Sequence, residues 1–181
     1  MCGIIGCVSE KDCCGALYDG LKRLEYRGYD SAGIAVLGEK LSVCKKKGGV
    51  SALSCFFAQG NTGIGHTRWA THGAPSDTNA HPHRAGKIVL VHNGIAENFS
   101  ALKAELEGAG ERFYSETDTE VIAKLISRAY RGDLLSAVKE GLSRVEGSYA
   151  VAVIAEDRPG ELVAAKYKSP LVAGKGAAGL F

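Results

Sequence analysis

Apolar residues in the first part of the chain follow two different spacings. Residues 4–8 form a short continuous apolar run, which is typical of a buried strand. Leu17, Leu21 and Leu24 then recur at four and three residues with charged residues between them, and this period predicts an amphipathic helix. Since glycine disfavours helix interiors, we expect this helix to end near Gly28.

The middle of the chain reads as short strands separated by turns. Apolar runs predict strands at residues 33–37, 41–44, 63–67 and 87–92. Residues 71–85 are rich in proline, asparagine and histidine, and they predict a loop between the last two of these strands. The dipeptide Asn93-Gly94 follows directly, and it is the strongest short signal for a hairpin turn.

Helical periods dominate the next segment before strands return. We expect helices over residues 98–107, 117–129 and 134–145, then strands at 148–155 and 162–167. Thr117 and Glu120 have the spacing of a capping box, which predicts where the second of these helices begins. The order shows no regular strand–helix alternation, so it favours an α+β fold with antiparallel sheets covered by helices.

Composition narrows the class of protein. The 181 residues suffice for one domain, 45% are hydrophobic, and Lys+Arg 22 against Asp+Glu 20 leaves a net charge of +2. We expect no nucleic-acid partner, because the only basic run is residues 45–47. The longest apolar stretch is far too short for a membrane span, and no secretory signal precedes it. We therefore expect a cytoplasmic protein with no membrane association.

Cys2 gains chemical meaning from its position. Cysteine at position 2 is small enough for an aminopeptidase to remove Met1. Its removal would place a thiol and a free α-amine on the same residue, Cys2. An α-amine has a reference pKa of about 7.7 to 8.0 and can take the proton of a cysteine thiol, so Cys2 would hold both nucleophile and base. The dipeptide alone does not distinguish this from an ordinary second residue.

Four further residues have both a structural and a chemical interpretation. Arg68 is either an ordinary arginine at a strand end or a guanidinium group that binds a carboxylate through two hydrogen bonds. Asp118 either stabilises the N-terminus of a helix through its negative charge or binds an ammonium group of a substrate. Together they would hold the two charged ends of an α-amino acid. Asn93 and Gly94 predict a turn, and their side-chain amide and backbone N–H could also donate to one oxyanion.

Two other motifs are weaker. All five histidines fall between residues 66 and 92, which leaves a metal-binding module open, but no HExxH motif or acidic cluster accompanies them, so we expect no metal. Residues 174–179 match GxGxxG, yet only two residues follow in this sequence. With no helix to receive a phosphate, this is not a dinucleotide site.

Taken together, several segments resemble the class II glutamine amidotransferase domain of the glutamine:fructose-6-phosphate amidotransferases, also called glucosamine-6-phosphate synthases. The matching segments are CGIIG at 2–6, LEYRGYDSAG at 24–33, HTRWATHG at 66–73, NAHPH at 79–83, HNGI at 92–95, SETDTE at 115–120 and SPLV at 169–172. They span nearly the whole chain in the family's order. Gly65 stands where many relatives have alanine, a change of little consequence.

The resemblance implies a fold and a role for each matching residue. The fold is a four-layer αββα sandwich of the N-terminal nucleophile hydrolases. Cys2 attacks the glutamine side-chain amide, and Asn93 and Gly94 form the oxyanion hole. Arg68 holds the substrate carboxylate and Asp118 its ammonium group. The remaining implied positions are Thr71, His72 and Gly73 in the pocket, Arg27 and Trp69 near the nucleophile and ammonia passage, and His81 near a domain junction.

The resemblance also implies partners and limits. The substrate is L-glutamine, no cofactor is needed, and the complete enzyme is a homodimer that uses the ammonia to convert fructose 6-phosphate into glucosamine 6-phosphate. Residues 1–181 would be a C-terminally truncated glutaminase domain without the sugar-isomerase domains. A catalytically silent structural fragment remains an alternative, because missing strands could leave the pocket loose.

Overall fold

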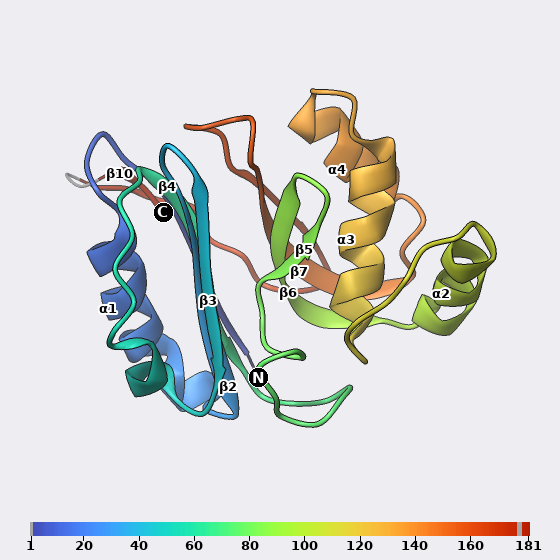
Figure 1. Ribbon diagram of the computed structural model, residues 1–181, viewed down its shortest axis with the longest axis horizontal. Helices are drawn as coiled ribbons and strands as arrows, with labels where there is room; N and C mark the ends of the chain where they lie inside the picture. The colour runs from blue at the N-terminus through green and yellow to red at the C-terminus, as the bar shows by residue number, and fades with distance from the viewer. Residues whose placement is uncertain (1, 177–178) are drawn as a thin grey trace.

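Four layers make up the molecule: helix α1, a six-stranded sheet, a four-stranded sheet, and helices α3 and α4 (Figure 1). The computed structural model describes residues 2–176 and 179–181. The strand order is β3-β2-β4-β1-β10-β9 in one sheet and β5-β6-β7-β8 in the other, and all these neighbours pair antiparallel. The expected α+β fold with four αββα layers is therefore confirmed.

The elements have the following bounds. The six-stranded sheet contains β1 (Gly3–Val8), β2 (Ser31–Leu37), β3 (Leu41–Lys47), β4 (Thr62–Arg68), β9 (Lys175–Gly176) and β10 (Gly179–Leu180). The four-stranded sheet contains β5 (His83–Ala85), β6 (Ile88–Ala96), β7 (Gly147–Ala155) and β8 (Val163–Tyr167). The helices are α1 (Cys14–Leu24), α2 (Phe99–Gly108), α3 (Asp118–Ala129) and α4 (Leu134–Leu142), with short 3-10 turns η1 (Glu25–Arg27) and η2 (Val50–Leu53).

Alternating side chains on the central strands build three apolar layers. On β7, Val151 and Val153 face the helices, while Ala152 and Ile154 face the other sheet, as the two-residue period of a strand requires. The core between the sheets contains Ala35, Leu37, Ile64, Val89, Val91, Ala152 and Ile154. This layer fixes the two sheets against each other, because each large apolar side chain buried in it stabilises the fold by about 1.5–3 kcal/mol.

The outer layers follow the predicted helical stripes. Leu17 and Leu21 of α1 are fully buried against the six-stranded sheet, which confirms the helix read from their spacing. Helices α3 and α4 pack against β6 and β7 through a second cluster that includes Ile122, Ile126 and Leu134. No helix in the described part of the chain is long and apolar enough to cross a membrane.

The predicted turn at Asn93-Gly94 is wrong. Strand β6 runs through both residues to Ala96, and they pair with Ala150 and Tyr149 of β7. Gly94 has a φ of +134°, and a Cβ there would lie 2.0 Å from the carbonyl oxygen of Ser148. Glycine is therefore required here because the neighbouring strand lies close and φ is positive, and not because the chain turns.

The predicted capping box is also wrong, although the helix begins where it was expected. Thr117 is the N-cap of α3 but makes no side-chain capping bond, and its hydroxyl contacts His83 instead, 3.0 Å away. The Glu120 carboxylate accepts hydrogen bonds from the backbone of Tyr114 and Ser115. Both side chains thus hold the segment before α3, because buried polar partners there compete for them.

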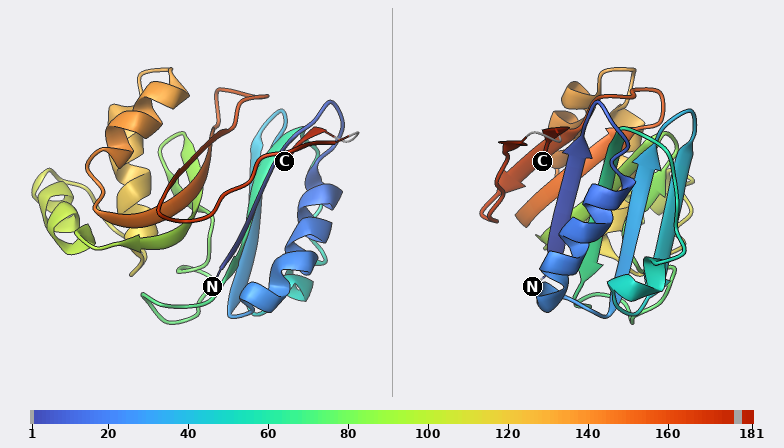
Figure 2. Two further views of the ribbon diagram at one scale, coloured as in Figure 1. Left: turned by 180° about the vertical axis from the view of Figure 1, so that it is seen from behind. Right: turned by 90° about the vertical axis from the view of Figure 1, so that its left-hand side faces the viewer.

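Smaller differences concern loops and ends. The loop expected over 71–85 ends in strand β5, and α4 ends at Leu142, three residues earlier than predicted. The GxGxxG segment contributes the short paired strands β9 and β10, while its residues 177 and 178 lie outside the described residues. After β8, the C-terminal segment crosses from the four-stranded sheet and pairs with β1 in the other sheet (Figure 2).

Candidate active site

Four segments far apart in the sequence meet at one small cavity. Cys2 lies just before β1, and the pairing of Gly3 with Thr67 brings it next to Arg68 at the end of β4. Gly94 comes from β6 in the other sheet, and Asp118 is the first residue of α3. The cavity has a volume of about 30 Å³. Its lining consists of Cys2, Arg68, Trp69, Thr71, His72, His81, His92, Gly94, Thr117, Asp118 and Thr119.

The Cys2 thiol lies against the backbone of Trp69. The Trp69 N–H donates to Sγ at 3.2 Å, and Sγ lies 3.5 Å from the Trp69 carbonyl oxygen. Burial raises the pKa of Cys2, and the Trp69 N–H and the positive Arg68 act against that increase. A thiol with a raised pKa needs a base to become a nucleophile. The expected removal of Met1, which would free the α-amine, concerns a residue outside the described ones.

Asn93 points its side chain at the same residue. Its amide nitrogen Nδ2 donates to the carbonyl oxygen of Cys2 at 3.0 Å. An amide nitrogen carries two hydrogens, so one of them is used by this bond and the second is available to another acceptor beside the thiol.

Arg68 is buried, and one edge of its guanidinium group is covered by the following loop. Nη2 donates to the carbonyl oxygens of His72 and Gly73. Nη1 is buried and has no hydrogen-bond partner among the described residues. Burial lowers the pKa of Arg68, and the nearby Cys2 and Asp118 oppose that change. Since arginine stays protonated in proteins, the cavity has a buried positive charge with a free donor.

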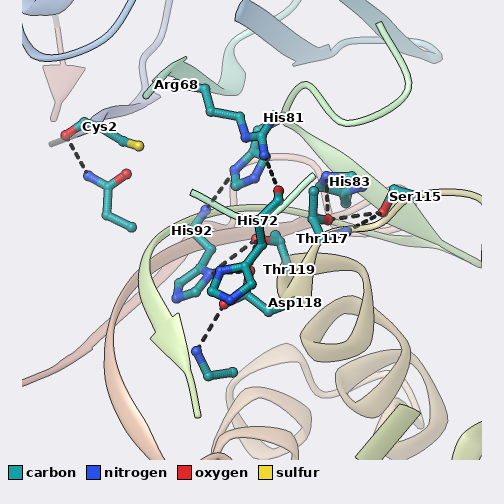
Figure 3. A network of polar contacts seen from close by, with 12 residues as sticks. Cys2, Arg68, His72, His81, His83, His92, Ser115, Thr117, Asp118 and Thr119 are labelled. Carbon is teal, nitrogen blue, oxygen red and sulfur yellow. Dashed lines mark hydrogen bonds and ion pairs between the residues drawn. The ribbon is translucent and has the colours of Figure 1, made fainter. Parts of the chain in front are cut away.

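Asp118 supplies the opposite charge. Asp118 is 6% exposed, and its Oδ2 accepts a hydrogen bond from the backbone N–H of Ala96 at 2.9 Å. The other oxygen lies 3.9 Å from Nδ1 of His92. A carboxylate in the first turn of a helix is also stabilised by the helix dipole. One cavity is therefore lined by a buried guanidinium and a buried carboxylate (Figure 3).

The other predicted site residues differ in whether they line the cavity. Thr71, His72 and His81 line the cavity, and the Gly73 carbonyl binds Arg68. Arg27 does not line the cavity: it lies in η1, where its Nε donates to the Tyr26 hydroxyl at 3.0 Å.

Trp69 lines the cavity and is 46% exposed. Its ring meets that of Tyr29 edge to face, with centroids 5.6 Å apart.

Sequence reasoning missed residues that hold the site in place. The Asp30 carboxylate accepts from the Ala70 N–H at 2.9 Å, and its own backbone N–H donates to the Arg68 carbonyl. Asn79 joins the Ala74 carbonyl to the Glu116 carboxylate and so anchors the loop that contains residues 71–76. Both residues fall within the motifs quoted above, but only the fold shows what they contact.

The clustered histidines are packed inside the protein. His66, His81, His83 and His92 are all at most 5% exposed, and the His66 and His81 rings stack with centroids 4.1 Å apart. Among residues 2–176 and 179–181, no group of three or more histidine, cysteine, aspartate or glutamate side chains is arranged to hold a metal ion.

Comparison with known proteins agrees with this geometry. The family described as "Glutamine amidotransferase domain" matches residues 66–177. A Thermus thermophilus protein named glutamine–fructose-6-phosphate aminotransferase [isomerizing] is 57% identical, and the match covers 97% of this chain and 30% of that protein. The chain thus spans about 30% of the length of such curated relatives.

Two solved structures share the fold. The allosteric regulatory enzyme of purine biosynthesis matches with a TM-score of 0.84 and 31% identity, covering 98% of this chain and 40% of that one. The B. subtilis glutamine phosphoribosylpyrophosphate amidotransferase matches with a TM-score of 0.77 and 31% identity, covering 90% and 36% of the two chains. The N-terminal nucleophile fold expected from the motifs is confirmed, and the chain belongs to the glutamine amidotransferase family of enzymes.

Proposed function

We propose that this chain hydrolyses L-glutamine to glutamate and ammonia at the cavity beside Cys2. Arg68 binds the α-carboxylate of the substrate and Asp118 its α-ammonium group. This orientation directs the substrate side chain towards the Cys2 thiol. Asn93 Nδ2 and the Gly94 N–H donate to the oxyanion that forms at the side-chain carbonyl.

The chemistry requires two additions to one carbon. Cys2 Sγ attacks the side-chain carbonyl carbon, and the thiol proton passes to the α-amine of Cys2, which is free once Met1 has been removed. That proton moves to the leaving nitrogen as the C–N bond breaks, so ammonia departs and a glutamyl thioester remains. Water then adds to the thioester, one of its protons returns to sulfur, and glutamate leaves.

One observation supports the proposal above the others. The same cavity as the cysteine thiol is lined by a buried carboxylate and by a buried guanidinium, one nitrogen of which has no hydrogen-bond partner within residues 2–176 and 179–181. Burying charged groups is unfavourable unless they are paired, so a site of this kind favours a ligand that brings one charge of each sign. A free α-amino acid has that pair of charges, and the thiol lies beside them.

Substrate entry requires the loop to move. A cavity of about 30 Å³ has room for about one water molecule, whereas glutamine is several times larger. The carbonyls of His72 and Gly73 occupy one edge of the Arg68 guanidinium, so the loop that carries them contacts the group that would bind the substrate carboxylate. We propose that the loop shifts to admit glutamine and then folds over it.

Alkylation by 6-diazo-5-oxo-norleucine, a reactive glutamine analogue, tests the proposal together with glutamate release. Intact mass should show loss of Met1 and one adduct, and Cys2→Ala should abolish both the adduct and glutamate production. Cys55→Ala is the matched control, because Cys55 is an exposed free thiol and its removal should leave both signals unchanged. Glutamate production at the wild-type rate by Cys2→Ala would overturn the assignment.

The relatives suggest a wider context. A protein of the same family named glutamine–fructose-6-phosphate aminotransferase is about three times longer than the matched region. We infer that this chain supplies the glutaminase part of such an enzyme, acts in the cytoplasm and works as a homodimer. Its ammonia would convert fructose 6-phosphate into glucosamine 6-phosphate in the sugar-isomerase part.

A further inference from the structure

His66 lies behind the proposed oxyanion hole and has no role in the chemistry described so far. It is in the middle of β4 and is fully buried. Its Nε2 lies 2.9 Å from Oδ1 of Asn93 and 3.1 Å from the carbonyl oxygen of His92. Both contacts cross from the six-stranded sheet to β6 of the other sheet.

The two contacts together fix the position of a proton. A backbone carbonyl oxygen can only accept, so the contact with His92 requires that Nε2 carries a hydrogen. The Asn93 atom that faces Nε2 must then also be an acceptor, and this places the amide oxygen towards His66. It follows that the amide nitrogen faces Cys2.

The imidazole ring is held neutral and fixed in place. Burial lowers the pKa of His66 to about 3, so the ring has a single N–H at neutral pH. Its Nδ1 is buried without a hydrogen-bond partner among the described residues, which leaves Nε2 as the position for that hydrogen. The ring also stacks on His81 at a tilt of 27°, and this packing limits its rotation.

We propose that His66 is a positioning residue for glutamine hydrolysis: its Nε2–H holds the Asn93 side-chain amide so that Nδ2 faces the position beside Cys2 where the oxyanion would form. This inference rests on the proposed function, since it assigns Asn93 as an oxyanion donor. His66 is not among the residues that line the cavity, so we expect its effect on turnover to pass chiefly through Asn93. Without it, the Asn93 amide could rotate by half a turn and present an oxygen to the oxyanion.

A matched pair of substitutions separates this role from simple packing. The His66→Gln variant keeps a side-chain N–H that can reach Asn93 and His92. The His66→Leu variant fills a similar space but has no hydrogen-bond donor. His66→Leu should lower kcat about 10- to 100-fold, somewhat less than removal of an oxyanion donor, with KM for glutamine changed less than about threefold. His66→Gln should recover most of the loss.

A double-mutant comparison tests whether the effect passes through Asn93. In an Asn93→Ala background, His66→Leu should lower kcat no further, because the group that it positions is already absent. Wild-type kcat in His66→Leu would overturn the inference, as would equal losses in the two backgrounds. Glutamate production by the wild type and its loss in Cys2→Ala, measured in the same assay, report on the proposed function separately.

A measurement on the unsubstituted protein covers the case in which His66→Leu does not fold. Nitrogen-15 spectra of labelled histidine side chains distinguish the two neutral tautomers and the charged ring. We expect the His66 ring to be the neutral Nε2–H form at pH 7. A proton on Nδ1, or a charged ring at that pH, would refute the proposed orientation of Asn93.

Discussion

Acid is expected to destabilise this domain because three buried histidines must remain neutral in the fold. His66, His81 and His83 are at most 5% exposed. Burial lowers the pKa of each ring from its ordinary value of 6.5, and that of His66 to about 3. In the unfolded chain the same rings bind protons as the pH falls through about 6.5. The unfolded state therefore gains protons that the folded state does not, and stability falls with falling pH.

The size of the effect follows from the number of rings. At pH 5.5, each exposed ring in the unfolded chain is about 90% protonated, which stabilises the unfolded state by about 1.4 kcal/mol. Three such rings remove about 4 kcal/mol relative to pH 7.5. Since domains of this kind are stable by about 5–15 kcal/mol, this loss is a large fraction of the total.

Urea unfolding followed by far-ultraviolet circular dichroism at pH 7.5 and 5.5 measures this loss. His66→Gln removes one titrating ring, so the difference between the two pH values should shrink by about 1.4 kcal/mol in that variant. Equal free energies of unfolding at both pH values in the wild type would refute the reasoning. That result would mean that the rings take up protons in the folded state.

Three further substitutions test separate features. Gly94→Ala should destabilise the fold by about 1–3 kcal/mol or more and abolish turnover, because φ is +134° and the added Cβ would lie too close to the Ser148 carbonyl oxygen. Its control is Gly108→Ala at an unobstructed helix end, which should cause no loss of stability in thermal melts of both variants. Arg68→Lys should raise KM for glutamine about 10-fold or more through loss of the fork, and an unchanged KM would contradict the assignment. Lys46→Ala removes an exposed ion pair with Asp77 and should leave the urea midpoint essentially unchanged, so a clear fall in the midpoint would show that the pair contributes more than its exposure implies.

Secondary structure that depends on the local residue pattern could be predicted from the sequence. Structure that depends on the contacts a segment makes in the fold could not. Helix α1 followed directly from the spacing of its leucines, because one apolar face packs on one sheet. Asn93-Gly94 has a strong local turn signal, but the pairing of β6 with β7 across nine residue pairs overrides it. Glu120 has the spacing of a capping box, but it accepts hydrogen bonds from backbone N–H groups five and six residues upstream, where the chain bends back towards the start of α3.

The candidate site divides in the same way. Cys2, Arg68 and Asp118 could be chosen from the sequence, because each chemical type suits its proposed task and stands in a specific motif. Their convergence on one cavity could not be derived, since it depends on strand pairing and on the packing of two sheets. The role of His66 was missed for this reason: its contact with Asn93 joins positions 27 residues apart.

We expect the layer of apolar side chains between the sheets also to keep the groups of the proposed reaction aligned. Arg68 ends a strand of one sheet and Cys2 directly precedes another strand of it, whereas the proposed oxyanion donors Asn93 and Gly94 belong to the other sheet. A substitution at Ile64 or Val91 that shifts one sheet along the other would move the Cys2 thiol relative to Asn93 and Gly94 while leaving each sheet intact. We therefore expect turnover to respond to changes in this inner packing more sensitively than the melting temperature does.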